Sequence, residues 1–554
     1  MTININTMAV VTSALGVVAI FLPRIKRRIE LSRAKHRSLT GHSKIAKRVA
    51  RLVPGYAYGP EKFFDSDQAP AEVVARRKQG FERLATLLRE RCPKSIALTE
   101  QARDGISDLQ FTGVYRVPFQ FSPYCREHLK IGSFVESTGG VTVQDLDGNS
   151  YYDLTGSYGV NVFGIDFYKD CIREGATRAE ALGPVLGFYH RCVAANVERL
   201  RGISRLDEVS FHMSGTEAVM QAVRLARYHT GRTHLVRFCG AYHGWWEDVQ
   251  PGPGNPLSPR HTYTLKDMAP AALNVLRTRK DIACVLVNPL QALHPNSPAP
   301  GDSTLVDSGR KAKFDREAYT AWLKDLQRVC TERGIVLILD EVFVGFRLAA
   351  RGAQEYFGIQ ADMVTYGKTI AGGLPVGVLC GRRDLMCRFK KDRPADICFA
   401  RGTFNSHPYV MTSMQVFLER AESSDVLRLY ENLDAIWNER AERMNAALAK
   451  ENLPARVVNL STIWTVVYDE PSRYNWMFQF YLRAHELALS WVGTGRFIFS
   501  LNYTDQEFDE VMRRFVLAGR AMVEDGWWFQ DSSLTNKSIR RGLLREILQH
   551  RFGR

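Results

Sequence analysis

The sequence predicts an α/β fold: a large domain with a mostly parallel, doubly wound sheet, followed by a smaller C-terminal α/β domain. Short apolar strands are expected at 235–237, 283–287, 335–339, 363–365 and 376–380. They alternate with long amphipathic helices, which is typical of βαβ units with helices on both faces of a sheet. Beyond Ser413 long helices dominate and few strands such as 498–501 remain, which indicates the second domain.

Composition limits the class of protein that the chain can be. With 554 residues, of which 45% are hydrophobic and 24% charged, it can bury a large core and form more than one domain. Its ten cysteines include no CxxC pair, and no histidines accompany them at metal-ligand spacing. We therefore expect free thiols in a reducing compartment and no bound metal.

Positive charge is concentrated near the N-terminus. The formal net charge is +15, but residues 24–51 hold eleven Lys and Arg against one acid, Glu30. No zinc finger, RNP-type aromatic motif or basic zipper accompanies them. We therefore expect no nucleic-acid partner.

An apolar run precedes this basic segment. Residues 8–22 carry no charge and end at Pro23, and with the uncharged lead-in they approach the roughly 20 residues of a bilayer span. The basic residues follow the run, which is the reverse of a cleaved signal peptide. We expect a membrane-associated protein with a single N-terminal anchor, or a helix lying in the interface, and a cytoplasmic catalytic domain. The alternative is a buried or partner-binding apolar helix.

Changes in composition divide the rest of the chain. A linker is indicated by Pro, Gly and Tyr at 54–64, and a hairpin by Asp147-Gly148 within an alternating stretch. The tail has a helical apolar stripe, which we expect to dock on the body, with a second membrane contact as the alternative. The expected units are 1–53 (anchor and basic juxtamembrane segment), 54–140 (linker and N-terminal helical segment), 141–412 (large domain), 413–531 (small domain) and 532–554 (basic tail).

Three segments carry chemistry, and the first is a turn at the start of a helix. Ser214, Gly215 and Thr216 follow the strand 208–212 and open a helix. Free backbone N–H groups and the positive end of the helix dipole suit a phosphate there. An ordinary helix cap explains the same residues about as well.

The second segment is an acidic pair, Asp340-Glu341, at the end of the apolar strand 335–339. Ligand-binding groups of α/β enzymes lie at this carboxyl edge of a parallel sheet, and an acid there can pair with a protonated ring nitrogen. The alternative is a pair that caps the strand and faces solvent.

The third segment is Lys368, which follows the short strand 363–365 and lies among glycines. Desolvation beside a cationic ring would lower the pKa of this amine and make it a nucleophile. A nucleotide-binding P-loop would need an upstream glycine, which Gly367-Lys368-Thr369 lacks.

The order of the three segments matches the needs of pyridoxal 5′-phosphate (PLP). This cofactor requires a phosphate cradle, an acid on its pyridinium nitrogen and a Schiff-base lysine. The lysine follows Asp340 by 28 residues. We therefore expect PLP as the cofactor, with Lys368 and Asp340 as the catalytic residues.

Over roughly residues 100–525 the chain resembles a class III aminotransferase of PLP fold type I, most like the glutamate-1-semialdehyde aminomutase branch. The matching segments are VQDLDGNSYYDLTGSYGVNVFG (143–164), SGTEAVMQAVRLAR (214–227), AYHGWW (241–246), LDEVFVGFR (339–347), DMVTYGKTIAGGLPVGVLCGRRDLM (362–386) and GTFNSHP (402–408).

The resemblance implies a role for each matching residue. Lys368 would form the Schiff base and then shuttle a proton, and Asp340 would hold the ring nitrogen protonated. Val342 would pack under the ring with Tyr242 stacked on its other side and His243 beside them. A homodimer with shared active sites is implied, because the phosphate would be held by Ser214, Gly215, Thr216 and, from the neighbouring subunit, Thr403.

Three departures from the family pattern leave the substrate open. Asn288 stands where a glutamate is usual, Met213 replaces a common asparagine, and Phe343 fills a position that is often Gln or Met. The cofactor chemistry tolerates these changes. The substrate is not fixed by the resemblance.

A substrate carboxylate calls for an arginine, whose planar guanidinium binds it in a bidentate manner. Arg496 lies where ω-aminotransferases of this class carry such an arginine, and Arg116 lies near that of the aminomutase branch; Arg496 is slightly favoured. Either could instead be a surface or salt-bridging arginine. The resemblance also places Ser157 near the substrate.

The sequence therefore favours an aminotransferase that moves an amino group from a small amino-acid donor to an aldehyde or ketone. Because an N-terminal anchor is expected, the acceptor would be lipophilic or presented by a carrier at a membrane. One alternative is an aminomutase of the glutamate-1-semialdehyde type. Another is a membrane-tethered scaffold without catalysis, against which the presence of Asp340 and Lys368 argues.

Overall fold

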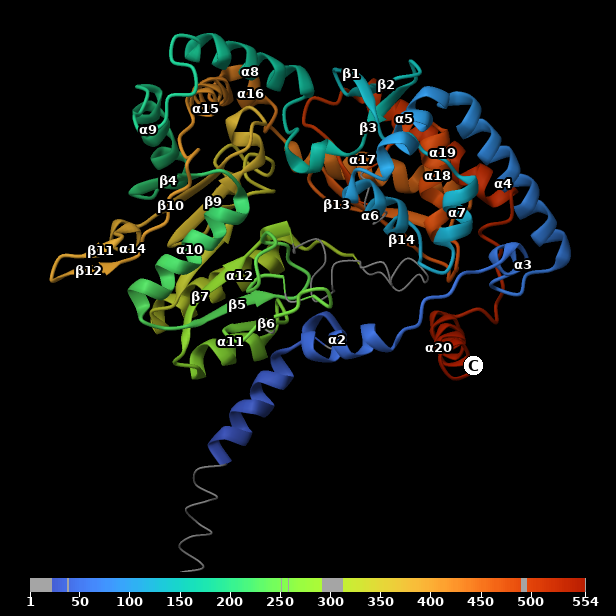
Figure 1. Ribbon diagram of the computed structural model, residues 1–554, viewed down its shortest axis with the longest axis horizontal. Helices are drawn as coiled ribbons and strands as arrows, with labels where there is room; N and C mark the ends of the chain where they lie inside the picture. The colour runs from blue at the N-terminus through green and yellow to red at the C-terminus, as the bar shows by residue number, and fades with distance from the viewer. Residues whose placement is uncertain are drawn as a thin grey trace, which may run out of the picture.

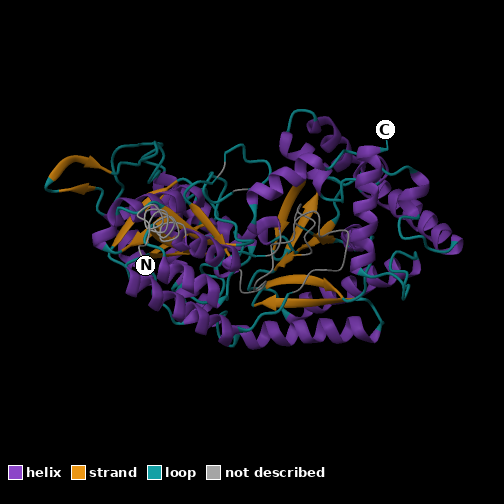
Figure 2. Cartoon of the chain, turned by 90° about the horizontal axis from the view of Figure 1, so that it is seen from below, coloured by secondary structure: helices purple, strands orange, loops and turns teal. Residues whose placement is uncertain are grey.

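The chain forms two lobes, which it enters more than once (Figure 1). The computed structural model describes residues 22–36, 39–250, 252–257, 259–290, 312–489 and 496–553. Strands form the interior of each lobe and helices surround them (Figure 2). The large lobe is built on a seven-stranded sheet, and the second lobe combines residues 60–153 with the segments after α16 (Ser424–Arg428).

The seven-stranded sheet confirms the predicted α/β architecture. In spatial order its strands are β4 (Glu208–His212), β10 (Gly377–Gly381), β9 (Met363–Gly367), β8 (Val336–Asp340), β7 (Ile282–Val287), β5 (His234–Phe238) and β6 (Thr262–Leu265). All neighbouring pairs are parallel except those of β10, which runs antiparallel to both β4 and β9. The strands predicted from apolar runs all lie in this sheet.

Helices cover both faces of the sheet because its central strands are apolar on both sides. Ile338 of β8 packs in one buried cluster with α10 (Gly215–Thr230). Its neighbours Leu337 and Leu339 point the opposite way and pack in a second cluster with α12 (Arg316–Arg333). Alternate residues of one strand thus serve two cores, as in a doubly wound fold.

Further helices complete the large lobe and the connections. Their bounds are α8 (Ile165–Ala179), α9 (Cys192–Ser204), α11 (Pro270–Thr278), α13 (Gly352–Phe357), α14 (Arg383–Met386) and α15 (Pro408–Ala421), with short 3₁₀ turns η2 (Gly156–Gly159) and η5 (Lys368–Ala371). A two-stranded hairpin, β11 (Phe389–Lys390) with β12 (Arg393–Ile397), projects from this lobe (Figure 1).

The second lobe contains two small sheets. One pairs β13 (Ala455–Leu460), β14 (Ile463–Tyr468) and β16 (Arg496–Ile498), and the other pairs β1 (Val135–Gly139), β2 (Thr142–Asp145), β3 (Ser150–Asp153) and β15 (Leu487–Ala488). The predicted hairpin is present, with its turn at Gly148, whose φ of 85° favours glycine. β2 and β3 were expected in the large domain, but they belong to this small sheet, in which β3 pairs with β15 from the C-terminal part of the chain.

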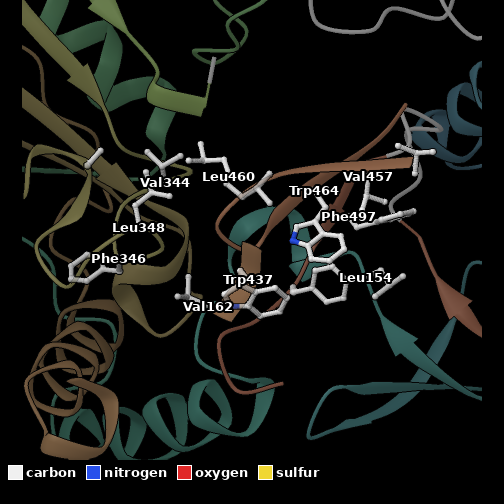
Figure 3. Close-up of a cluster of buried hydrophobic side chains, with 14 of the residues drawn as sticks. Leu154, Val162, Val344, Phe346, Leu348, Trp437, Val457, Leu460, Trp464 and Phe497 are labelled. Carbon is white, nitrogen blue, oxygen red and sulfur yellow. The ribbon is translucent and has the colours of Figure 1, made fainter. Parts of the chain in front are cut away.

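Aromatic packing holds the second lobe together. Trp437 from α17 (Leu433–Lys450), Trp464 from β14 and Phe497 from β16 gather around Leu154 (Figure 3). The Trp437 and Trp464 rings meet edge to face with centroids 6.1 Å apart. The remaining helices of this lobe are α3 (Pro60–Phe64), α4 (Ala71–Arg91), α5 (Pro93–Arg103), α6 (Ser107–Tyr115), α7 (Ser122–His128), α18 (Phe478–Ala484) and α19 (Asp505–Glu524), with η6 (Asn475–Met477).

The two ends of the chain carry basic helices. Residues 22–34 and α2 (Ser43–Leu52), separated by η1 (Leu39–Gly41), precede the linker, and α20 (Asn536–Phe552) ends the chain. The predicted docking of the tail is confirmed, since Ile539 is buried and the Glu546 carboxylate lies 3.0 Å from Arg473 Nη1.

The predicted membrane anchor falls largely outside the described part of the chain. Only Leu22 of the apolar run 8–22 is described. Within the ranges that the structure describes, no helix has both the length and the apolar character needed to cross a bilayer. All ten cysteines are free thiols, and nine of them are buried.

Candidate active site

Asp340 is fixed at the carboxyl edge of the central sheet. It ends β8, is 2% exposed, and its Oδ2 lies 2.7 Å from Nδ1 of the buried His243. Its Oδ1 accepts hydrogen bonds from Val342 N at 3.1 Å and from Thr365 Oγ1 at 3.3 Å. Each oxygen therefore has a donor, and the carboxylate has a single orientation.

Glu341, the second acid of the pair, faces a different part of the lobe. Its carboxylate accepts hydrogen bonds from Ala353 N at 2.6 Å and Gln354 N at 3.1 Å, and so caps the start of α13. Burial raises the pKa of Glu341 to about 8. The alternative of an acidic pair facing solvent is wrong, because both acids are buried.

Lys368 directly follows β9, the strand next to the one that ends at Asp340. β8 and β9 are parallel with Asp340 opposite Thr365, and Lys368 follows three residues later in the left-handed region with φ 52°. Burial lowers the pKa of Lys368 below its ordinary value, and the Asp340 carboxylate opposes that shift. Lys368 is thus desolvated as expected, and its role as the Schiff-base lysine stays a prediction. The Phe343 ring centroid lies 5.5 Å from Nζ.

The predicted phosphate turn lies at the start of α10, beside these residues. Ser214 caps the helix, because its Oγ accepts from Glu217 N at 3.3 Å. The cap and the anion site are compatible, since the cap leaves the first N–H groups of the helix available. A Cβ on Gly215 would lie 2.6 Å from Val342 Cγ1, so glycine allows the turn to approach Val342 closely.

The loop carrying Tyr242 and His243 adjoins the phosphate turn. Gly244 has a φ of 92°, and a Cβ there would overlap Thr216 Oγ1. His243 is 2% exposed, and burial lowers its pKa while Asp340 opposes the shift, so the ring is held neutral with Nδ1–H donating to Asp340. Tyr242 is 61% exposed, and its carbonyl accepts from Asn288 Nδ2 at 3.2 Å.

The predicted substrate residues lie around the 3₁₀ turn η2. Ser157 has a φ of 44°, and a Cβ on its neighbour Gly159 would lie 2.6 Å from Phe343 Cε2. Gly156 contacts Ile498 of β16, which shares a strand face with Arg496 two residues earlier. The turn η2 therefore contacts Phe343, whose ring lies near Lys368, and also β16, the strand that carries Arg496.

Both predicted arginines are partly buried in this region. Burial lowers the pKa of Arg496 to about 10, and its Nε has no hydrogen-bond partner among the residues that the structure describes. Burial and the nearby Arg483 lower the pKa of Arg116 to about 10, and the Tyr158 side chain opposes this shift. Arg496 forms no ion pair within the described ranges.

Thr403 lies apart from these residues, on an exposed turn after the β11–β12 hairpin. Thr403 is predicted to contact the cofactor phosphate of a neighbouring subunit, and this contact stays a prediction because the structure contains one subunit. The same holds for the stacking of Tyr242 on the cofactor.

Sequence reasoning missed two buried arginines that organise the site. Arg237 donates to the carbonyls of Ala241 and Val249 and so holds the Tyr242–His243 loop. Arg347 donates to Thr462 Oγ1 at 2.9 Å, Phe499 O at 2.6 Å and Asn161 O at 2.8 Å, which joins the lobes. Each is an arginine in an otherwise apolar stretch of sequence, and this pattern could have indicated a buried, hydrogen-bonded arginine.

The residues present fit PLP. A buried carboxylate with fixed orientation suits a protonated ring nitrogen, a desolvated amine suits the aldehyde, and a helix start in contact with Val342 suits the phosphate. All three come from adjoining elements of one sheet edge. The fold and the site together define a PLP enzyme of fold type I.

Comparisons with known proteins agree. The family described as aminotransferase class-III matches residues 124–247 and 315–518. A glutamate-1-semialdehyde 2,1-aminomutase from Methanocaldococcus jannaschii is 30% identical over 362 residues, covering 62% of this chain and 78% of that protein. The chain belongs to the class-III aminotransferase family and is a PLP-dependent enzyme.

Solved structures show the same fold. A transaminase with PLP bound is 26% identical with a TM-score of 0.58, over 71% of this chain and 92% of that chain. A glutamate-1-semialdehyde aminomutase from Pseudomonas aeruginosa PAO1 is 18% identical with a TM-score of 0.64, over 82% of this chain and 99% of that chain.

Proposed function

We propose that this enzyme transfers an amino group from an amino-acid donor to an aldehyde or ketone. The observation that carries the proposal is the placement of Asp340 at the end of β8 and of Lys368 directly after the adjacent parallel strand β9, with Thr365 opposite Asp340. When bound, PLP supplies an aldehyde that takes up the amino group and a ring that stabilises the charge left when Cα loses its proton.

The residues of this chain would act around that group as follows. Asp340, oriented by His243 and Thr365, would hold the ring nitrogen protonated. Lys368 would hold the cofactor between turnovers and then move the proton between Cα and C4′, which a lowered pKa favours near neutral pH. Val342 would support one face of the ring.

The donor carboxylate would bind Arg496. Burial of this guanidinium and the lack of a partner for its Nε within the described residues support this role, because a buried arginine gains most from a bidentate anion. Ser157, on the turn that contacts β16, would lie beside the substrate.

An aminomutase of the glutamate-1-semialdehyde type is the second candidate. It is supported by the Methanocaldococcus jannaschii relative and by Arg116, which lies close enough to Tyr158 of η2 to interact with it electrostatically. In that case Arg116 would bind the carboxylate, and the amino group would return within one molecule.

A homodimer would complete the site through Thr403. Exposed aromatic side chains support this, since Phe399 and Phe404 flank Thr403 and Trp245 follows Tyr242. Apolar surface of this kind marks protein interfaces. Analytical sedimentation should show a dimer. Thr403→Ala should weaken PLP binding while the protein remains a dimer.

The acceptor would be lipophilic or carrier-bound, and the enzyme would work at a membrane with its catalytic domain in the cytoplasm. The apolar run 8–22 and the basic segment after it support this, because together they suit a single N-terminal anchor.

Substrate assays test these proposals. Single amino donors added to the PLP-loaded enzyme should change the visible absorbance of the cofactor, and long-chain aldehydes should restore it. Arg496→Lys should raise the KM of the donor about tenfold or more with little change in kcat, whereas Arg116→Lys should not. Efficient conversion of glutamate-1-semialdehyde, with long-chain carbonyls ignored, would favour the aminomutase instead.

A further inference from the structure

Three basic helices at one end of the molecule expose apolar side chains to solvent. They are the helix 22–34, α2 and α20, which lie on the same side of the protein in Figure 1. We name them the basic platform. The exposed apolar residues are Leu22, Ile25 and Ile29 on the first helix, Ile45, Val49 and Leu52 on α2, and Leu544, Leu548 and Phe552 on α20.

The spacing of these residues places them on one stripe of each helix. Separations of three or four residues bring side chains to the same helical face. Ile45, Val49 and Leu52 are 51%, 37% and 50% exposed, and Leu544, Leu548 and Phe552 are 57%, 45% and 72% exposed. A helix of a globular protein normally buries such a stripe, and among the residues that the structure describes nothing covers these stripes.

Basic residues accompany every stripe. Residues 22–36 and 39–53 hold ten Lys and Arg against the single acid Glu30, and α20 holds five against the single acid Glu546. Glu546 is ion-paired with Arg473 of the second lobe, so it does not neutralise the outer face of α20. The platform is therefore both apolar and strongly cationic.

The platform is fixed to the catalytic body and its parts contact one another. Arg551 Nη1 at the end of α20 donates to Leu52 O at the end of α2 at 2.8 Å. The His550 and Tyr56 rings stack with centroids 4.2 Å apart. The helix 22–34 is held to the large lobe by Lys266 N, which donates to Ala34 O at 2.8 Å.

From this arrangement we propose that the basic platform is a docking surface for anionic phospholipid bilayers, in which α20 and α2 insert their apolar stripes among the acyl chains while their basic residues meet the headgroups. Helices with a strongly charged face and a leucine- and phenylalanine-bearing apolar face are the kind that lie in a membrane interface. Lys and Arg near an anionic leaflet add electrostatic attraction.

The charge and the apolar stripes together select this occupant. A nucleic acid would use the cations but would leave the Leu and Ile stripes in water. A second copy of the platform would bring like charges together, which opposes association. The inference concerns contact made by α2 and α20, and it does not depend on the reaction proposed above.

Vesicle flotation of the full chain tests the proposal. Wild-type protein should bind vesicles of phosphatidylcholine with phosphatidylserine, bind vesicles of phosphatidylcholine alone much less, and lose binding as salt rises. The double variant Leu544→Gln with Leu548→Gln should lower the partition coefficient about tenfold or more, because two exposed stripe residues no longer enter the apolar layer. Arg541→Glu with Arg545→Glu should have a similar effect that salt diminishes.

Controls make a negative result informative. Leu427→Gln changes an exposed leucine of α16, far from the platform in Figure 1, and should bind vesicles like wild type. Each variant should keep the wild-type unfolding midpoint and the wild-type PLP absorbance. Amino-transfer activity in solution should also be unchanged, so failure of this proposal and failure of the proposed reaction are separable.

Several results would overturn the proposal. The first is that wild-type protein binds neither kind of vesicle. The second is that the α20 variants bind as well as wild type, which would assign any membrane contact to the run 8–22. The third is that the variants change the sedimentation coefficient, or lose binding to an RNA while keeping vesicle binding, which would assign the surface to a second copy or to a nucleic acid.

Discussion

Replacing His243 by leucine removes the hydrogen bond that orients Asp340. The bond joins two buried side chains at 2.7 Å, and His243 Nδ1–H is the donor because the Asp340 carboxylate oxygen accepts. A hydrogen bond to a charged group contributes about 1.5–3 kcal/mol. We therefore expect His243→Leu to lower the free energy of unfolding of the cofactor-free protein by about that amount at pH 8.

The pH dependence of this loss has a definite sign. Because the folded-state pKa of His243 lies below its ordinary value of 6.5, the unfolded chain binds the additional proton as pH falls. His243 therefore makes the wild-type protein lose stability as pH falls below 6.5, and the leucine variant lacks this contribution. The difference between the two proteins should shrink between pH 8 and pH 5.5.

Denaturant unfolding at these two pH values measures the effect, and cofactor affinity gives a second readout. His243→Asn is the matched control, because its amide can donate from nearly the position of Nδ1. It should recover most of the stability and most of the PLP affinity, whereas His243→Leu should raise the Kd of PLP about tenfold. A leucine variant within about 0.5 kcal/mol of wild type, or an asparagine variant as impaired as leucine, would refute the reasoning.

Three further predictions follow from buried contacts. Gly215→Ala should raise the Kd of PLP, because the added Cβ would lie 2.6 Å from Val342 Cγ1, and Val342→Ala should partly restore affinity; failure of this rescue in a binding titration would contradict the contact. Glu341→Gln should flatten the pH dependence of unfolding between about pH 5 and pH 8, since a carboxyl with a pKa of about 8 binds protons in the fold that the unfolded chain has lost, and wild-type stability therefore falls as pH rises. Arg347→Met should lower the free energy of unfolding by about 2–5 kcal/mol, because three acceptors lose their donor, and an unchanged chemical denaturation curve would show that they find others.

Local patterns were enough to predict the sheet and the core of the site. Apolar runs such as 283–287 are buried on both faces, and only a central parallel strand gives that pattern. Asp340 ends such a strand and Lys368 directly follows the next one, and the carboxyl ends of parallel strands meet at one edge. Their proximity was therefore implied by strand order alone.

Contacts distant in sequence could not be predicted in this way. Arg347 binds Thr462 and Phe499, which lie more than a hundred residues away, and nothing near Arg347 in the sequence specifies them. The different roles of Asp340 and Glu341 depend on where α13 begins, because backbone N–H groups at the start of that helix donate to Glu341. The pairing of β3 with β15 likewise joins segments over three hundred residues apart.

The exposed stripes of the basic platform show a different limit. A sequence gives the apolar period of α20, but it cannot say which part of the stripe the body covers. Ile539 is 3% exposed, while Leu544 is 57% exposed on the same helix. The Arg473–Glu546 ion pair holds α20 in an orientation that buries Ile539 and leaves the later apolar residues of the stripe exposed.

Borohydride reduction of the PLP-loaded enzyme, followed by peptide mapping, tests the central claim most directly. Reduction makes the bond between the cofactor and its lysine permanent, so the modified residue can be identified by mass. The account predicts a single phosphopyridoxyl group on Lys368, with much less labelling in Asp340→Asn. Labelling of another lysine, or none at Lys368, would contradict it.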